Sequence, residues 1–179
     1  MTDQLRFFGK SLVPAREVDW EAAYQADLPR LYNFFRYRVG DDLVAEDLTA
    51  ETFEKAWRNR HRYRYDLAAF STWLFTIARH ITADYFRKPH PEVPLDAASQ
   101  VVDDETVESL IQQCSDFERL SILLARLTDR DRELVALKYG AGLTNRTIAH
   151  LIGLSESNVG TILHRVTQYL RSAWDEEKP

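Results

Sequence analysis

Hydrophobic residues recur at three- and four-residue steps through most of this chain, the spacing that places them on one face of an α-helix. In the first half this pattern predicts helices over residues 19–39, 41–60 and 70–88, with Gly40 ending the first. Acidic residues crowd the start of the second helix, where the positive end of the helix dipole favours them. Residues 61–69 have no such pattern and are predicted to form a loop.

The second half repeats the helical pattern after a break. Pro89, Pro91 and Pro94 interrupt any helix, and an acidic stretch follows them. Helical spacing resumes near Glu105, and further helices are predicted over 129–139, 144–152 and 156–174, the first of these opened by a cap between Thr128 and Asp131. No segment alternates as a strand would, so the predicted fold is all-α. We predict two small helical domains joined by an acidic linker, with the division 1–18 (N-terminal extension), 19–88, 89–104 (linker) and 105–179.

The net charge of −5 conceals an uneven distribution along the chain. Residues 89–118 carry no Lys or Arg against 8 Asp and Glu, whereas residues 119–174 carry 8 basic against 4 acidic residues. The acidity therefore comes mainly from the middle of the chain. Residues 119–174 have an excess of positive charge, which favours binding to nucleic acid.

Composition argues against several other classes of protein. No apolar run approaches the roughly 20 residues that a membrane span needs, and the start, MTDQLRFFGK, lacks a secretory hydrophobic region. Cys114 is the only cysteine, which suits a reducing compartment. The histidines and Cys114 show no metal-ligand spacing. We therefore expect a cytoplasmic protein with no membrane partner, no metal and no cofactor.

Residues 144–166 have the pattern of a helix-turn-helix. Ala149 is small enough for two helices to meet, and Gly153 allows the left-handed backbone of the turn between them. Ser155 is a natural N-cap for the second helix. That helix presents polar side chains that can reach a DNA major groove. A helical hairpin in which these small residues serve packing alone is the alternative.

The end of the second predicted helix and the loop after it combine basic and aromatic residues. The stretch WRNRHRYRY, residues 57–65, alternates arginines with Trp57, Tyr63 and Tyr65. Aromatic rings stack on unpaired bases while guanidinium groups follow the phosphates, so this composition is typical of single-stranded DNA binding. A solvated arginine face over a tyrosine-rich core would have the same composition.

Two blocks of the chain resemble a known family. Residues 28–63, with AEDLTAETFEKAW, and residues 69–88, with FSTWLFTIAR, resemble region 2 of the sigma-70 family of RNA polymerase sigma factors. Residues 126–171 resemble region 4 of that family. The layout of two blocks without intervening domains is similar to the extracytoplasmic-function group. The resemblance implies a non-enzymatic subunit that binds core RNA polymerase, recognises and melts promoter DNA at transcription initiation, and is held inactive in many relatives by an anti-sigma factor.

The resemblance also implies roles for individual residues, in three sets. Contacts with the largest polymerase subunit are implied for Asp47, Leu48, Glu51, Thr52, Phe53 and Trp57. Binding of the opened, single-stranded minus-ten element is implied for Arg58, Arg60, Arg62, Tyr63, Tyr65, Trp73, Arg79, His80 and Arg87. Reading of the double-stranded minus-thirty-five element is implied for Ser155, Glu156, Ser157, Asn158, Thr161, His164 and Arg165.

The last helix departs from the family pattern. Gly160, Ile162, Thr167, Gln168 and Tyr169 stand where basic residues are common in the family. Fewer cations mean fewer phosphate contacts, so region 4 alone is expected to bind DNA weakly and to depend on tethering to polymerase.

Two other functions fit parts of the sequence. A stand-alone helix-turn-helix regulator would use residues 20–88 as a sensor or dimer module and would bind a symmetric operator. An all-α enzyme could use carboxylates such as Glu46, Asp47, Glu51 and Glu54, but no histidine or second carboxylate helix accompanies them at matching spacing.

Overall fold

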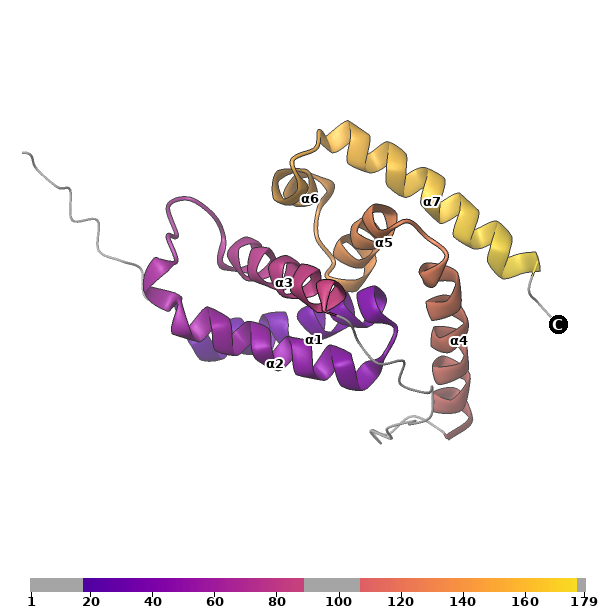
Figure 1. The fold of residues 1–179 in the computed structure, drawn as a ribbon, viewed down its shortest axis with the longest axis horizontal. Helices are drawn as coiled ribbons and strands as arrows, with labels where there is room; N and C mark the ends of the chain where they lie inside the picture. Colours follow the sequence, from indigo (N-terminus) through magenta and orange to yellow (C-terminus); the bar gives the residue numbers. More distant parts are fainter. Residues whose placement is uncertain (1–17, 89–106, 177–179) are drawn as a thin grey trace, which may run out of the picture.

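The computed structural model describes residues 18–88 and 107–176, with the side chains of the second range described from residue 115 onward. Most of the predicted extension and the whole predicted linker lie outside the described residues, so the predicted division at these points stays a prediction. The described residues form helices and no strand, which confirms the all-α prediction. Figure 1 shows the helices of the first half on one side and those of the second half on the other.

The first half consists of α1 (Trp20–Val39), α2 (Asp42–Arg58), the short 3-10 helix η1 (Arg60–Arg62) and α3 (Phe70–Arg87). Asp19 caps α1 by accepting a hydrogen bond from the Ala22 amide, and Gly40 ends it in the left-handed conformation with φ of 74°. Asp41 caps α2 in the same way through Val44. These ends agree with the sequence prediction to within about two residues, the usual uncertainty of helix boundaries.

The second half consists of α4 (Val107–Ala125), α5 (Asp129–Val135), the π-helical turn η2 (Ala136–Gly140), α6 (Asn145–Ile152) and α7 (Glu156–Glu176). Thr128 accepts a hydrogen bond from the Asp131 amide, as the capping pattern predicts. The single helix predicted over 129–139 needs correction, because the backbone widens after Val135. The Ala141 amide bonds to the Ala136 carbonyl, five residues back, at 2.8 Å.

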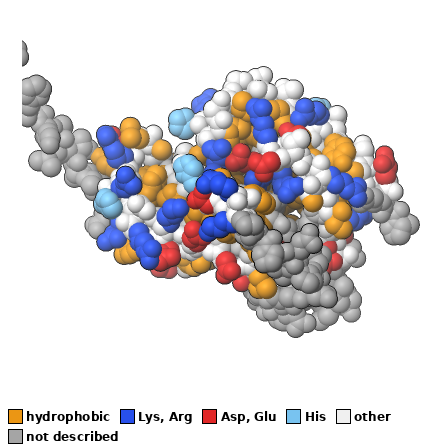
Figure 2. All heavy atoms as spheres, viewed as in Figure 1, with side chains coloured by type: hydrophobic (Ala, Val, Ile, Leu, Met, Phe, Trp, Pro, Cys, Tyr) orange, Lys and Arg blue, Asp and Glu red, His pale blue; other side chains and the backbone are white. Residues whose placement is uncertain are grey.

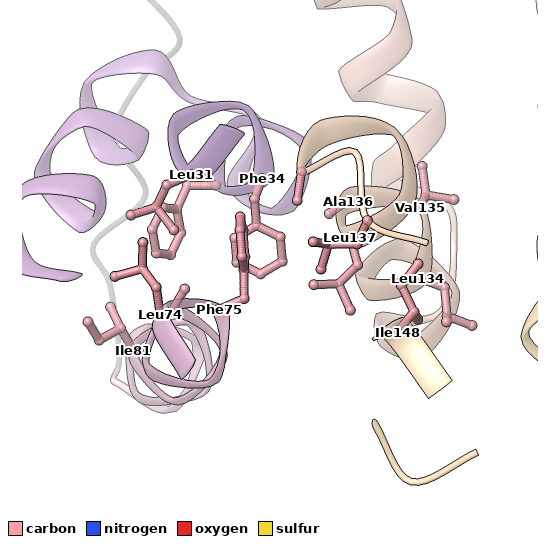
Figure 3. Close-up of a cluster of buried hydrophobic side chains, with 14 of the residues drawn as sticks. Leu31, Phe34, Leu74, Phe75, Ile81, Leu134, Val135, Ala136, Leu137 and Ile148 are labelled. Atoms are coloured by element: carbon pink, nitrogen blue, oxygen red, sulfur yellow. The ribbon is translucent and has the colours of Figure 1, made fainter. Parts of the chain in front are cut away.

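The two halves share one hydrophobic core. Phe34 on α1 packs edge to face against Phe75 on α3, and Leu137 of η2 belongs to the same buried cluster. Figure 3 shows the side chains of α1 and α3 facing those of α5 and η2 across this cluster. The sequence pattern did not predict this contact, because periodicity shows that a helix buries one face but not which helix covers it.

Candidate nucleic-acid and protein interfaces

A cluster of aromatic rings holds the loop between α2 and α3 against the start of α1. Trp20 packs edge to face on Trp57 and on Phe70, with ring centroids 5.1 and 5.3 Å apart. Tyr63 in the loop contacts Phe70 at 5.6 Å and Trp73 at 5.2 Å. Contacts of this kind stabilise by about 0.5–1.5 kcal/mol each beyond the area they bury. They fix the position of the loop.

Tyr63 stabilises the conformation of this loop. Its hydroxyl donates a hydrogen bond to the Ala68 carbonyl at 3.1 Å, and burial raises the pKa of its phenol. Phe70 and Trp73 already pack against its ring. Of the two tyrosines predicted to stack on bases, Tyr65 is the more exposed.

Basic side chains surround this packed loop. Figure 2 shows Lys and Arg gathered at the end of the molecule where α2 ends and the loop begins. Arg60 lies over the Trp57 ring, 4.4 Å from its centroid, and donates to the Trp57 carbonyl at 2.9 Å. Arg58 pairs with Glu54 at 2.6 Å, and both side chains are exposed. Exposed pairs of this kind contribute at most about 1 kcal/mol, so the arginine can exchange its partner for a phosphate at little cost.

A groove of about 640 Å³ runs between the end of α2, η1 and α3. It brings together predicted residues that are far apart in sequence, namely Arg62, Trp73, His80 and Arg87. The groove also has lining residues that the sequence analysis did not single out: Lys55, Asn59, Thr76, Ile77, Ala83 and Asp84. Their spacing of three and four residues from the predicted ones was the signal that could have found them.

Arg79, which the resemblance assigns to the minus-ten set together with His80, does not line this groove. Its Nε donates to Glu133 on α5 at 2.8 Å, and its Nη1 donates to the Leu151 carbonyl at the end of α6. One helix position separates His80 from Arg79, a rotation of about 100°, and this turns Arg79 towards the second half of the chain.

The exposed face of α2 is acidic with apolar margins. Asp47 and Glu51 are exposed, and Leu43 and Trp57 expose about half of their surface, at 48% and 50%. Phe53 is partly buried against Tyr24. The carboxylates would repel DNA phosphates, and the exposed apolar side chains beside them suit a protein partner.

Two residues predicted to contact polymerase lie inside the core instead. Leu48 has 6% of its surface exposed and Thr52 none, and the Thr52 hydroxyl donates to the Leu48 carbonyl at 2.7 Å. As the chain is folded here, neither side chain can touch a partner. Both lie on the buried face of α2, beneath its exposed surface.

The second helix of the predicted helix-turn-helix presents a polar face. Ser155 accepts a hydrogen bond from the Asn158 amide at 3.2 Å, as its prediction as the N-cap requires. The predicted DNA-reading residues are all exposed on this helix, namely Ser155, Glu156, Ser157, Asn158, Thr161, His164 and Arg165. Beneath them, Ile148, Ala149, Val159 and Leu163 form the shared core of α6 and α7.

Arg165 is held by a carboxylate of the neighbouring helix α5. Its Nη2 lies 3.0 and 3.2 Å from the two oxygens of Asp131, and the arginine remains largely exposed while the aspartate is mostly buried. An arginine held in this way can present its remaining donors to a guanine edge. If Arg165 reads bases as the resemblance implies, Asp131→Asn is expected to weaken its base discrimination. The expected loss is up to about 1 kcal/mol, because the arginine of this pair is largely exposed. Competition binding to duplexes substituted one base pair at a time, with the chain bound to the polymerase that the resemblance implies, measures this. Equal losses at every position would contradict it.

Gly160 lies in the second turn of α7 with room for a side chain. A methyl group there would lie 3.6 Å from Asn145 Nδ2, an ordinary contact distance. Because glycine costs a helix interior about 1 kcal/mol relative to alanine, Gly160→Ala is expected to raise the free energy of unfolding by about that amount. Urea denaturation followed by circular dichroism measures it. A lower midpoint for the variant would show that Gly160 is needed for packing.

Comparisons with known proteins agree with this architecture. The family model for Sigma-70 region 2 matches residues 23–90, and that for Sigma-70, region 4 matches residues 117–169. The ECF RNA polymerase sigma factor SigM of Bacillus subtilis is 31% identical over 153 residues, which cover 85% of this chain and 93% of SigM. BldN of Streptomyces coelicolor, also an ECF RNA polymerase sigma factor, is 31% identical over 145 residues. The match covers 78% of this chain but only 54% of BldN.

A solved structure has the same fold. The sigma factor RpoE of Bartonella quintana, in complex with the anti-sigma factor NepR, aligns with a TM-score of 0.65 at 20% identity over 89% of this chain and 99% of that one. The chain therefore belongs to the sigma-70 family, as one of its extracytoplasmic-function (ECF) sigma factors.

In the part of the chain that the structure describes, no helix is both long enough and apolar enough to cross a membrane.

Proposed function

We propose that this chain binds core RNA polymerase in the cytoplasm and directs it to promoters by non-covalent interactions alone, without catalysing a reaction. The observation that carries the proposal is the separation of three surfaces on one chain. The exposed face of α2 is acidic and partly apolar, the groove beside the α2–α3 loop is basic and aromatic, and α7 presents polar side chains from a helix-turn-helix.

These surfaces suit three different tasks. The face of α2 around Asp47 and Glu51 would bind polymerase, which leaves the groove for the melted minus-ten strand. A base extruded from a duplex costs a few kcal/mol to unstack, and contacts with aromatic side chains and cations can offset that cost. The exposed residues of α7 would read the minus-thirty-five element as a duplex. Melting then results from tighter binding of open than of closed DNA.

The proposal extends to an anti-sigma factor as a further partner. The RpoE structure that resembles this chain contains the anti-sigma factor NepR. The alignment covers 89% of this chain and 99% of that RpoE chain. The apolar margins of α2, Leu43 and Trp57, are exposed in this chain and would be covered by such a partner.

Selection from a random duplex library tests the proposal against a stand-alone regulator. The chain is incubated with the library alone and together with core polymerase, and the retained DNA is sequenced. We expect an asymmetric motif of two separated blocks, enriched only when polymerase is present. A palindromic motif retained by the chain alone would support the regulator instead, because a two-fold symmetric dimer binds a DNA site with the same symmetry.

A further inference from the structure

The polar side chains that line the groove beside the α2–α3 loop differ in exposure. Arg62 and Arg87 are exposed, whereas Asn59, Thr76 and Asp84 are partly buried. Exposed cations suit the phosphates of a bound strand, and contacts with phosphates carry no sequence information directly. The partly buried side chains are therefore the ones placed to contact a base.

The orientation of the Asn59 amide is fixed by its nitrogen. Nδ2 donates to the Lys55 carbonyl at 2.8 Å, and the Asn59 backbone amide donates to the same oxygen at 3.1 Å. Because a carbonyl only accepts, the nitrogen and not the oxygen of the side-chain amide must lie beside it. Oδ1 therefore lies on the other side of the amide, where its lone pairs can accept hydrogen bonds from a ligand in the groove.

The neighbouring helix adds two more acceptors. The Thr76 hydroxyl donates to the Thr72 carbonyl at 2.9 Å, and because a hydroxyl has one proton, its oxygen can only accept from a ligand. Asp84 binds Arg87 at 3.0 Å through one carboxylate oxygen, and carboxylate oxygens only accept. Thr76 and Asp84 lie on the same side of α3, two steps of four residues apart.

This set of acceptors favours a base edge that carries donors. Adenine, cytosine and guanine each have an exocyclic amino group, whereas thymine and uracil present one ring N–H between two carbonyl oxygens, which the acceptors would repel. Lys55, which also lines the groove, can donate to the ring nitrogen beside the amino group of adenine or cytosine. Trp73 and Ile77 supply apolar surface for the face of the ring.

We propose that the groove selects an unpaired base with an exocyclic amino group and rejects thymine, with Asn59 and Thr76 as specificity-determining residues. Neither belongs to the set that the resemblance assigns to the minus-ten element. The selection rests on the proposed function, because it requires single-stranded DNA in this groove. A carbonyl oxygen placed against the acceptors loses a hydrogen bond and leaves polar groups unpaired, which lowers affinity roughly tenfold.

Binding of the full chain to oligodeoxycytidine and oligodeoxyuridine, each about eight nucleotides long, tests the selection. The two oligonucleotides have the same backbone and differ only at the base edge, where cytosine has an amino group and uracil a carbonyl. Fluorescence anisotropy at low salt is expected to show roughly tenfold tighter binding of oligodeoxycytidine. The slope of log affinity against log salt should be the same for both, because their phosphates are the same.

Thr76→Val and Asn59→Leu are each expected to reduce this preference, and together to abolish it, while the salt slope stays unchanged. Thr82→Val is the matched control on the same helix, because the Thr82 hydroxyl makes the same bond, to the Ala78 carbonyl at 2.9 Å, but the residue is buried outside the groove. It should keep the wild-type preference. Thr76→Val alone decides the question if Asn59→Leu, which removes a bond at the end of α2, fails to fold by circular dichroism.

Equal affinity of wild type for the two oligonucleotides would overturn the selection and leave the proposed function intact. A preference that survives in the folded Thr76→Val and Asn59→Leu variants would overturn the assignment of these two residues. If wild type binds neither oligonucleotide at low salt, the groove is not a site for single-stranded DNA, and that part of the proposed function fails together with the selection.

Discussion

A chain carrying Asp47→Lys and Glu51→Lys is expected to lose at least about tenfold of its affinity for core polymerase, because like charges placed across an interface cost several kcal/mol. Both carboxylates are exposed on α2, so the fold should be unaffected. Fluorescence anisotropy of labelled chain titrated with core polymerase measures the loss.

Glu176→Lys is the matched control for this prediction, because it reverses one exposed charge at the far end of α7. It should bind polymerase as wild type does. Thermal unfolding of each variant shows that lost binding is not lost folding. Wild-type affinity in the double variant would remove this face of α2 from the polymerase interface.

Phe34→Ala is expected to lower the free energy of unfolding by about 3–5 kcal/mol, the range for a fully buried phenylalanine. Phe34 has no exposed surface, it contacts Phe35 and Phe75, and its backbone lies against Gly140. Urea denaturation followed by tryptophan fluorescence and by circular dichroism measures the loss. A loss of under about 1 kcal/mol would show that this part of the core is loosely packed.

The same experiment reports whether the two regions unfold together. Trp57 and Trp73 report on region 2 and Trp174 reports on region 4, so single-tryptophan chains separate the two signals. A shared core predicts coincident transitions that Phe34→Ala shifts together. If Phe34→Ala leaves the unfolding midpoint of region 4 unchanged, the two regions have independent cores.

Helices and caps were predictable from the sequence because they depend on neighbours along the chain. Gly40, Thr128 and Ser155 end or begin helices where the pattern places them, since a cap satisfies backbone groups within a few residues of itself. The polar face of α7 was also predictable from neighbours along the chain. The spacing of its apolar residues leaves one helix face for polar residues such as Asn158 and Arg165.

The contacts between the two halves were not predictable from the sequence. Arg79 and His80 are adjacent in the sequence. Arg79 makes intramolecular contacts only because Glu133 and the end of α6 lie beside it. Leu48 and Thr52 belong to a motif typical of the family, but a motif does not separate residues that touch a partner from residues that support them. The π-helical turn at Gly140 has no local signal, since it forms where α1 packs against it.

Run-off transcription tests the central claim most directly. Core polymerase is incubated with a genomic fragment library, with and without the purified chain, and the 5′ ends of the transcripts are sequenced. Initiation at a defined set of sites that share one two-part upstream motif, absent with core polymerase alone, is the predicted result. Transcripts that are identical in number and position with and without the chain would contradict its assignment as the promoter-reading subunit.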